Sequence, residues 1–118
     1  MIGNGEPHGF SIEAAALDDV YLIRLAGALD LASCGELMAA IRIGERSRTT
    51  RTVIDVEGLE FIDSTGLRLL LAANRRAELI NRDVRFTHGH GYVAYMLKTT
   101  ALDQTLPFVS GVGLGVSG

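Results

Sequence analysis

The sequence has few or no cysteine, proline, tryptophan and lysine residues. Its 118 residues include one cysteine, Cys34, two prolines and no tryptophan. A single cysteine excludes an intramolecular disulfide, which is typical of proteins in a reducing cytoplasm. Lys98 is the only lysine beside ten arginines, and the formal net charge is −3. This charge gives no support for binding to nucleic acid or to an anionic membrane.

Long hydrophobic runs are also missing. No apolar stretch approaches the roughly 18–20 residues that span a bilayer. Residues 1–9 have neither the positive start nor the apolar centre of a signal peptide. We therefore expect a cytoplasmic protein with no membrane contact. Residues 1–9 and the Gly-rich residues 110–118 are predicted to be a flexible leader and tail, which leaves one domain at residues 10–109.

Hydrophobic periodicity predicts the element order β-β-α-β-α-β-α. Strands are expected at residues 10–14, 20–28, 53–56 and 84–86. Helical segments are expected at residues 33–44, 67–82, 91–100 and 102–106. The first two strands are joined by a short acidic turn and should form an antiparallel hairpin. This order predicts an α/β fold with a mixed sheet of four or five strands, parallel at its centre, and helices mainly on one face.

The most informative stretch is Phe61-Ile62-Asp63-Ser64-Thr65-Gly66-Leu67, where a strand gives way to the long helix. Four backbone N–H groups at such a helix start lack intrahelical partners, and the helix dipole favours negative charge there. Asp63 and Ser64 are both preferred N-caps, worth about 1 kcal/mol each over alanine, so local physics favours capping. An exposed serine at this position would also have donors ready for a phosphate group.

The long helix is expected to bury one face and expose another. Its buried face is predicted to consist of Leu70, Ala73, Ala77 and Ile80. Three arginines recur every seven residues and predict a solvated stripe: Arg68, Arg75 and Arg82. Arg68 also lies four residues after Ser64, so a second interpretation is that its side chain reaches back toward that serine.

A second polar group precedes the first helix. Ser33 followed three residues later by Glu36 is a capping-box pattern, so Ser33 is expected mainly to cap that helix. From the residues alone, Asp30 is expected to close the loop before the helix through local backbone bonds; its second possible role, in a binding surface, is implied only by the resemblance described next. Asp55 is expected to be structural, at the C-terminal end of its strand.

Four segments together resemble the STAS domain family, specifically the bacterial anti-sigma-factor antagonists. They occur in the family's order over roughly residues 10–109: Gly27-Ala28-Leu29-Asp30-Leu31-Ala32-Ser33, Val53-Ile54-Asp55-Val56, Asp63-Ser64-Thr65-Gly66-Leu67 and Leu102-Asp103-Gln104-Thr105-Leu106-Pro107-Phe108. The resemblance implies the same α/β architecture. It also implies that an anti-sigma factor with serine kinase activity binds the unmodified protein, releases a sigma factor and phosphorylates its antagonist with ATP. A metal-dependent serine phosphatase would reset the cycle.

The resemblance also implies roles for individual residues. Ser64 is the expected phosphorylation site, because the family places the acceptor at the first hydroxyl after the aspartate. Thr65 is the competing acceptor. The expected partner-binding residues are Asp30, Ser33, Asp63, Thr65, Gly66 and Arg68. Arg68 departs from many relatives, which carry a small residue there. No cofactor, metal or catalytic residue is expected, and the oligomeric state is left open.

Other functions fit the sequence less well. A hydrolase or nucleotidase would need a Gly-x-Ser-x-Gly elbow or a Gly-rich phosphate loop with lysine, and neither is present. A receiver domain would need an acidic pair after its first strand, whereas Asp18 and Asp19 join strands predicted to be antiparallel. His88-Gly89-His90 lacks a third metal ligand and is expected to be a solvated loop. The alternative left open is a STAS scaffold or transporter-associated regulatory module without a phosphorylation switch.

Overall fold

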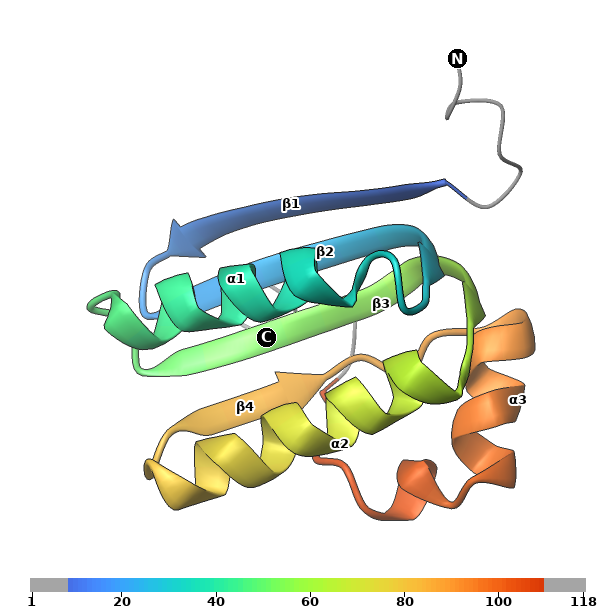
Figure 1. Cartoon of the computed structure of the whole chain (residues 1–118). Coiled ribbons are helices and arrows are strands. Elements are labelled where there is room, and N and C mark those ends of the chain that lie inside the picture. The colour runs from blue at the N-terminus through green and yellow to red at the C-terminus, as the bar shows by residue number, and fades with distance from the viewer. Residues whose placement is uncertain (1–8, 110–118) are drawn as a thin grey trace.

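The structure, a computed structural model, describes residues 9–109, so nearly all of the predicted leader and the whole predicted tail lie outside the described residues. Figure 1 shows the elements in chain order: β1 (Phe10–Leu17), β2 (Val20–Leu29), α1 (Cys34–Arg46), β3 (Arg51–Ile62), α2 (Ser64–Leu79), β4 (Asp83–Phe86), α3 (Gly91–Thr99) and a 3-10 turn (Leu102–Gln104). Within residues 9–109, no helix combines the length and apolar character required to cross a bilayer.

The four strands form one sheet in the order β1-β2-β3-β4. β1 and β2 are antiparallel, while β2 pairs with β3 and β3 with β4 in parallel. Past the last helical turn the chain returns to the β4 edge, where Phe86 bonds to the backbone of Pro107 and Val109 at 2.9 and 2.8 Å. The predicted mixed sheet, with its antiparallel hairpin and parallel centre, is confirmed.

The main core lies between this sheet and the helices α1 and α2, which run side by side over one face (Figure 1). α1 buries the predicted residues Leu37, Ala40 and Ile41, and α2 buries Leu67, Leu70, Ala73 and Ala77. They pack on inward side chains of the central strands, among them Ile23 and Ile54, which are fully buried. α3 lies at the side of the molecule where α2 begins (Figure 1), and its Val93 and Leu97 complete the core.

The third strand is longer than predicted. It continues past Val56 to Ile62 because Leu59 and Ile62 also point into the core, although Glu57, Gly58 and Glu60 interrupt the apolar run. Its pairing with β2 shifts register twice, between Arg24 and Ala26 and between Gly27 and Ala28. Such irregularities break the simple alternation that marks a strand in a sequence.

Asp55 therefore lies in the middle of β3, and its predicted place at the strand end is wrong. Its buried carboxylate accepts hydrogen bonds from Glu57 N at 2.9 Å and Thr87 Oγ1 at 3.2 Å. Thr87 Oγ1 in turn accepts a bond from Val56 N at 2.8 Å. Arg24 lies 3.5 Å from the second carboxylate oxygen. These contacts hold the irregular part of β3, which is a structural role.

Two predictions at the end of α2 are wrong. The helix ends at Leu79, and Ile80 is its exposed C-cap residue rather than part of the buried face. Asn81 then takes a left-handed backbone conformation, with φ of 58°, which turns the chain. Arg82 therefore lies outside the helix and is not part of the predicted solvated stripe. Its guanidinium donates to Thr49 O, Thr49 Oγ1 and Thr52 Oγ1 at 2.8–3.2 Å.

Candidate functional site

The candidate site lies where two neighbouring parallel strands end. Leu29, the last residue of β2, pairs with Ile62, the last residue of β3. Because the strands are parallel, the segments that follow them emerge at the same edge of the sheet. The backbone N–H of Asp63 donates to Leu29 O at 3.3 Å, which ties the start of α2 to the loop that begins at Asp30.

Asp63 is the N-cap of α2. Its Oδ1 accepts a hydrogen bond from Gly66 N at 2.9 Å, as a capping aspartate should. Ser64 is the first residue of the helix and is exposed, while Thr65 is half-buried. Among residues 9–109 no side-chain hydrogen bond engages the Ser64 hydroxyl. Asp63 therefore does the capping, and the serine hydroxyl stays accessible to solvent.

Gly66 holds the start of α2 against the end of β2. A Cβ atom at this position would lie 2.6 Å from Leu29 O and 2.8 Å from Ile62 Cγ1. Both distances are shorter than real Cβ contacts, so any larger residue would push the helix away. The glycine thus fixes the height of Ser64 above the sheet.

The loop between β2 and α1 is closed by Asp30 and Ser33. Asp30 Oδ1 accepts bonds from Ala32 N at 3.0 Å and Ser33 N at 3.3 Å. Ser33 Oγ is buried, lies 2.9 Å from Ala28 O and accepts a bond from Asp30 N at 2.9 Å. Asp30 therefore closes the loop by local bonds, as one of its two predicted roles required.

The predicted capping box at Ser33 is wrong. Within the described part of the chain, Ser33 makes no side-chain bond to the first turn of α1. Its backbone is already near-helical, with φ of −102° and ψ of −8°, instead of the extended conformation of a capping residue. The hydroxyl consequently turns back into the loop, where it satisfies buried backbone groups.

The site is electrostatically negative. Cys34 is the first residue of α1. Burial raises the pKa of its thiol most, and the negative charges of Asp63 and Asp30 raise it further. A thiol with a raised pKa is neither an activated nucleophile nor a ready metal ligand. Arg68 is exposed one turn into α2 and forms no ion pair with any other residue of the range 9–109.

An aromatic cluster beside the site escaped the sequence analysis. The ring of Phe61, at the end of β3, stacks on Tyr92 of α3 with centroids 5.5 Å apart, and Tyr95 follows 6.4 Å from Tyr92. Tyr92 is 44% and Tyr95 60% exposed, and Leu31 in the Asp30 loop is 76% exposed. Tyr92 and Tyr95 are three residues apart in a predicted helix, and this spacing could have predicted an aromatic face on it.

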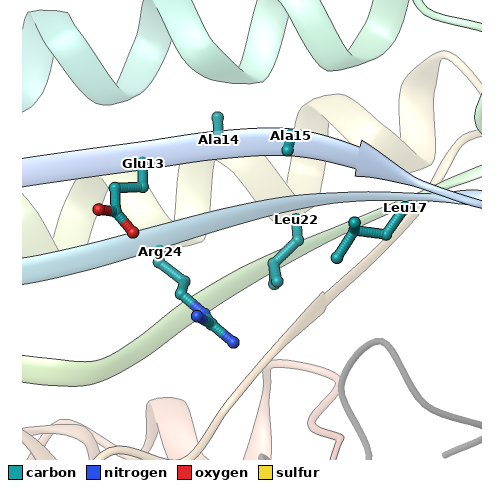
Figure 2. A pocket seen from close by; sticks show the side chains of 6 residues that line it. All are labelled: Glu13, Ala14, Ala15, Leu17, Leu22 and Arg24. Carbon is teal, nitrogen blue, oxygen red and sulfur yellow. The ribbon is translucent and has the colours of Figure 1, made fainter.

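Neither the histidine pair nor the surface pocket belongs to this site. His88 stacks on Phe108 at 4.5 Å, and residues 9–109 contain no cluster of three possible metal ligands. The pocket of about 170 Å³ in Figure 2 lies on β1 and β2, lined by Glu13, Ala14, Ala15, Leu17, Leu22 and Arg24. It is smaller than the usual 300–1,000 Å³ of small-molecule sites.

The chain belongs to the STAS domain family: the family model described as "Mlab, STAS domain" matches residues 12–110. Its fold is similar to that of an anti-sigma factor antagonist from Mycobacterium paratuberculosis, with a TM-score of 0.76 and 22% identity over 93% of each chain.

Two further structures share the fold. A single-residue variant of RsbS from Moorella thermoacetica has a TM-score of 0.72 and 22% identity, over 88% of this chain and 90% of that one. The Bacillus cell fate determinant SpoIIAA in its phosphorylated form has a TM-score of 0.61 and 21% identity, over 87% and 93%. No curated protein matches the chain significantly.

Proposed function

We propose that this chain is an anti-sigma-factor antagonist controlled by phosphorylation of Ser64. In its unmodified form it binds an anti-sigma factor with serine kinase activity, and the sigma factor is released. The kinase phosphorylates Ser64 with ATP and the complex dissociates. A metal-dependent serine phosphatase restores the binding form. The chain thus acts in the cytoplasm as a binding protein and not as an enzyme.

The observation that carries this proposal is the exposed hydroxyl of Ser64 at the start of α2. A kinase must reach its acceptor oxygen, and Asp63 leaves that oxygen available by supplying the cap itself. Membership of the STAS family and the similarity of the fold to the anti-sigma factor antagonist from Mycobacterium paratuberculosis support the same role. The partner surface would surround Ser64 and include Asp30, Asp63, Thr65 and Arg68. Ser33 and Gly66, which were also expected to bind the partner, are buried and would support this surface from within.

A phosphate at Ser64 can weaken binding without refolding the domain. It adds about −1.5 to −2 charges next to the Asp63 carboxylate. Docking of a partner removes the water that screens these groups from each other. Two unit charges about 5 Å apart repel by about 3 kcal/mol at an effective dielectric constant of about 20. Even half of that value corresponds to about a tenfold loss of affinity.

Ser64→Ala should abolish phosphate uptake while the complex with the kinase still forms. Purified protein would be incubated with candidate anti-sigma kinases and ATP, and the phosphate mapped by mass spectrometry. Thr65→Ala is the matched control and should still be phosphorylated. Undiminished labelling of Ser64→Ala would contradict the assignment. A partner that binds the wild type without ever phosphorylating it would favour a STAS scaffold or transporter-associated module.

Ser64→Asp should weaken the same complex only in part. A carboxylate carries about half the charge of the phosphate and less bulk. The affinity should therefore fall about threefold, compared with the loss of about tenfold expected on phosphorylation. Isothermal titration of wild type, Ser64→Asp and the phosphorylated protein against one kinase would measure the series. Equal affinities for wild type and Ser64→Asp would argue against a charge-based switch.

A further inference from the structure

Arg68 is an exposed cation beside the proposed modification site. Within residues 9–109 its side chain forms no ion pair. Arg42, Arg46, Arg48 and Arg75 also lack an ion pair within that range, whereas Arg76 bonds to Glu45 and Arg82 to two threonines. What distinguishes Arg68 is its position four residues after Ser64. Arg68 is therefore available to an anion that is added near it.

We infer that the guanidinium of Arg68 pairs with the phosphate on Ser64 and holds it over the start of α2. This inference rests on the proposed phosphorylation of Ser64. Residues four apart on a helix are neighbours, separated by about 6 Å along the axis. Helical side chains also lean toward the helix N-terminus, so the long Arg68 side chain leans toward Ser64 rather than away from it.

The backbone N–H groups at the start of α2 can donate to a phosphate, but the acidic side chains of the site do not favour it. The Asp63 carboxylate already accepts the bond from Gly66 N, and its negative charge repels the phosphate. Asp30 adds a second negative charge at the same edge, where it contributes to the raised pKa of Cys34. Arginine pairs well with phosphate because its planar fork donates two parallel hydrogen bonds to the oxygens.

The pairing has a consequence for the switch. Phosphorylation would add an anion and, in the same step, remove the Arg68 cation from the partner surface. The phosphate would be partly neutralised and fixed in one place, so it would remain a dianion at lower pH than a free phosphoserine. That property can be measured on the protein alone, without knowledge of its kinase.

The test is a phosphorus NMR titration of protein carrying phosphoserine at position 64, incorporated during synthesis. The second pKa of phosphoserine lies near 6. We expect Arg68→Ala to raise it by about 0.3 unit or more, because the dianion loses its cation. Arg68→Lys should restore part of the difference. Arg75→Ala, an exposed arginine on the same helix two turns further on, should leave the pKa unchanged.

Other titrating groups are common to all of these variants. Asp30, Asp63 and the Cys34 thiol lie at the site, and His88 and His90 lie in the loop before α3, so their contributions cancel in the comparison. Equal phosphate pKa values for Arg68→Ala and Arg75→Ala would overturn the inference. Failure of every kinase to label Ser64 would instead remove the proposed function and leave the titration result intact.

Discussion

Phe86→Ala should lower the free energy of unfolding by about 3–5 kcal/mol, the cost of emptying a large core site. Phe86 is 1% exposed and is one of only four residues in β4. Its ring contacts Phe108 edge-on, with centroids 6.5 Å apart, and its backbone anchors residues 107–109 to the sheet. The loss is a large share of the roughly 5–15 kcal/mol that stabilises a typical domain.

Urea unfolding followed by circular dichroism would measure this change. Tyr95→Ala is the matched control, because it also removes an aromatic ring but from an exposed position on α3. Its effect should stay within about 0.5 kcal/mol. A loss below about 1 kcal/mol for Phe86→Ala would contradict the placement of β4 and of the chain that returns beside it.

Gly66→Ala should destabilise the domain by about 1–3 kcal/mol, although alanine favours helices. The added methyl group would meet Leu29 O and Ile62 Cγ1 at distances that neither the strand nor the helix can accommodate without moving. The start of α2 must then rise from the sheet, and the bond between Asp63 N and Leu29 O would lengthen. Phosphorylation of Ser64 should therefore slow as stability falls.

Gly35→Ala is the matched control for this substitution. Gly35 is the second residue of α1, and a Cβ there would meet nothing within 4 Å. The same chemical change should stabilise the protein by about 0.4–1 kcal/mol, because it restricts the unfolded chain without a clash. Thermal unfolding of the two variants would compare them. A gain in stability for both would mean that the α2 start does not press on β2.

Most of the fold could be predicted from the sequence because helices and hairpins are marked by patterns among residues that are close together in the chain. The apolar spacing that marked Leu70, Ala73 and Ala77 is the spacing with which α2 packs on the sheet. The turn at Asp18 and Asp19, between two largely apolar runs, indicated the hairpin. The same signals failed where contacts from distant residues took over, as in the second half of β3, which packs through Leu59 and Ile62 despite its polar residues.

The candidate site shows the same division. The sequence by itself determined that Asp63 and Ser64 stand at the start of a helix, because that follows from residues a few positions apart, but it left open which of the two caps the helix. Only the tertiary structure decided that the Asp30 loop lies beside that helix and that Arg82 bonds to Thr49 and Thr52. Those outcomes depend on strand pairing and on groups some thirty positions apart in the chain, which no local pattern encodes.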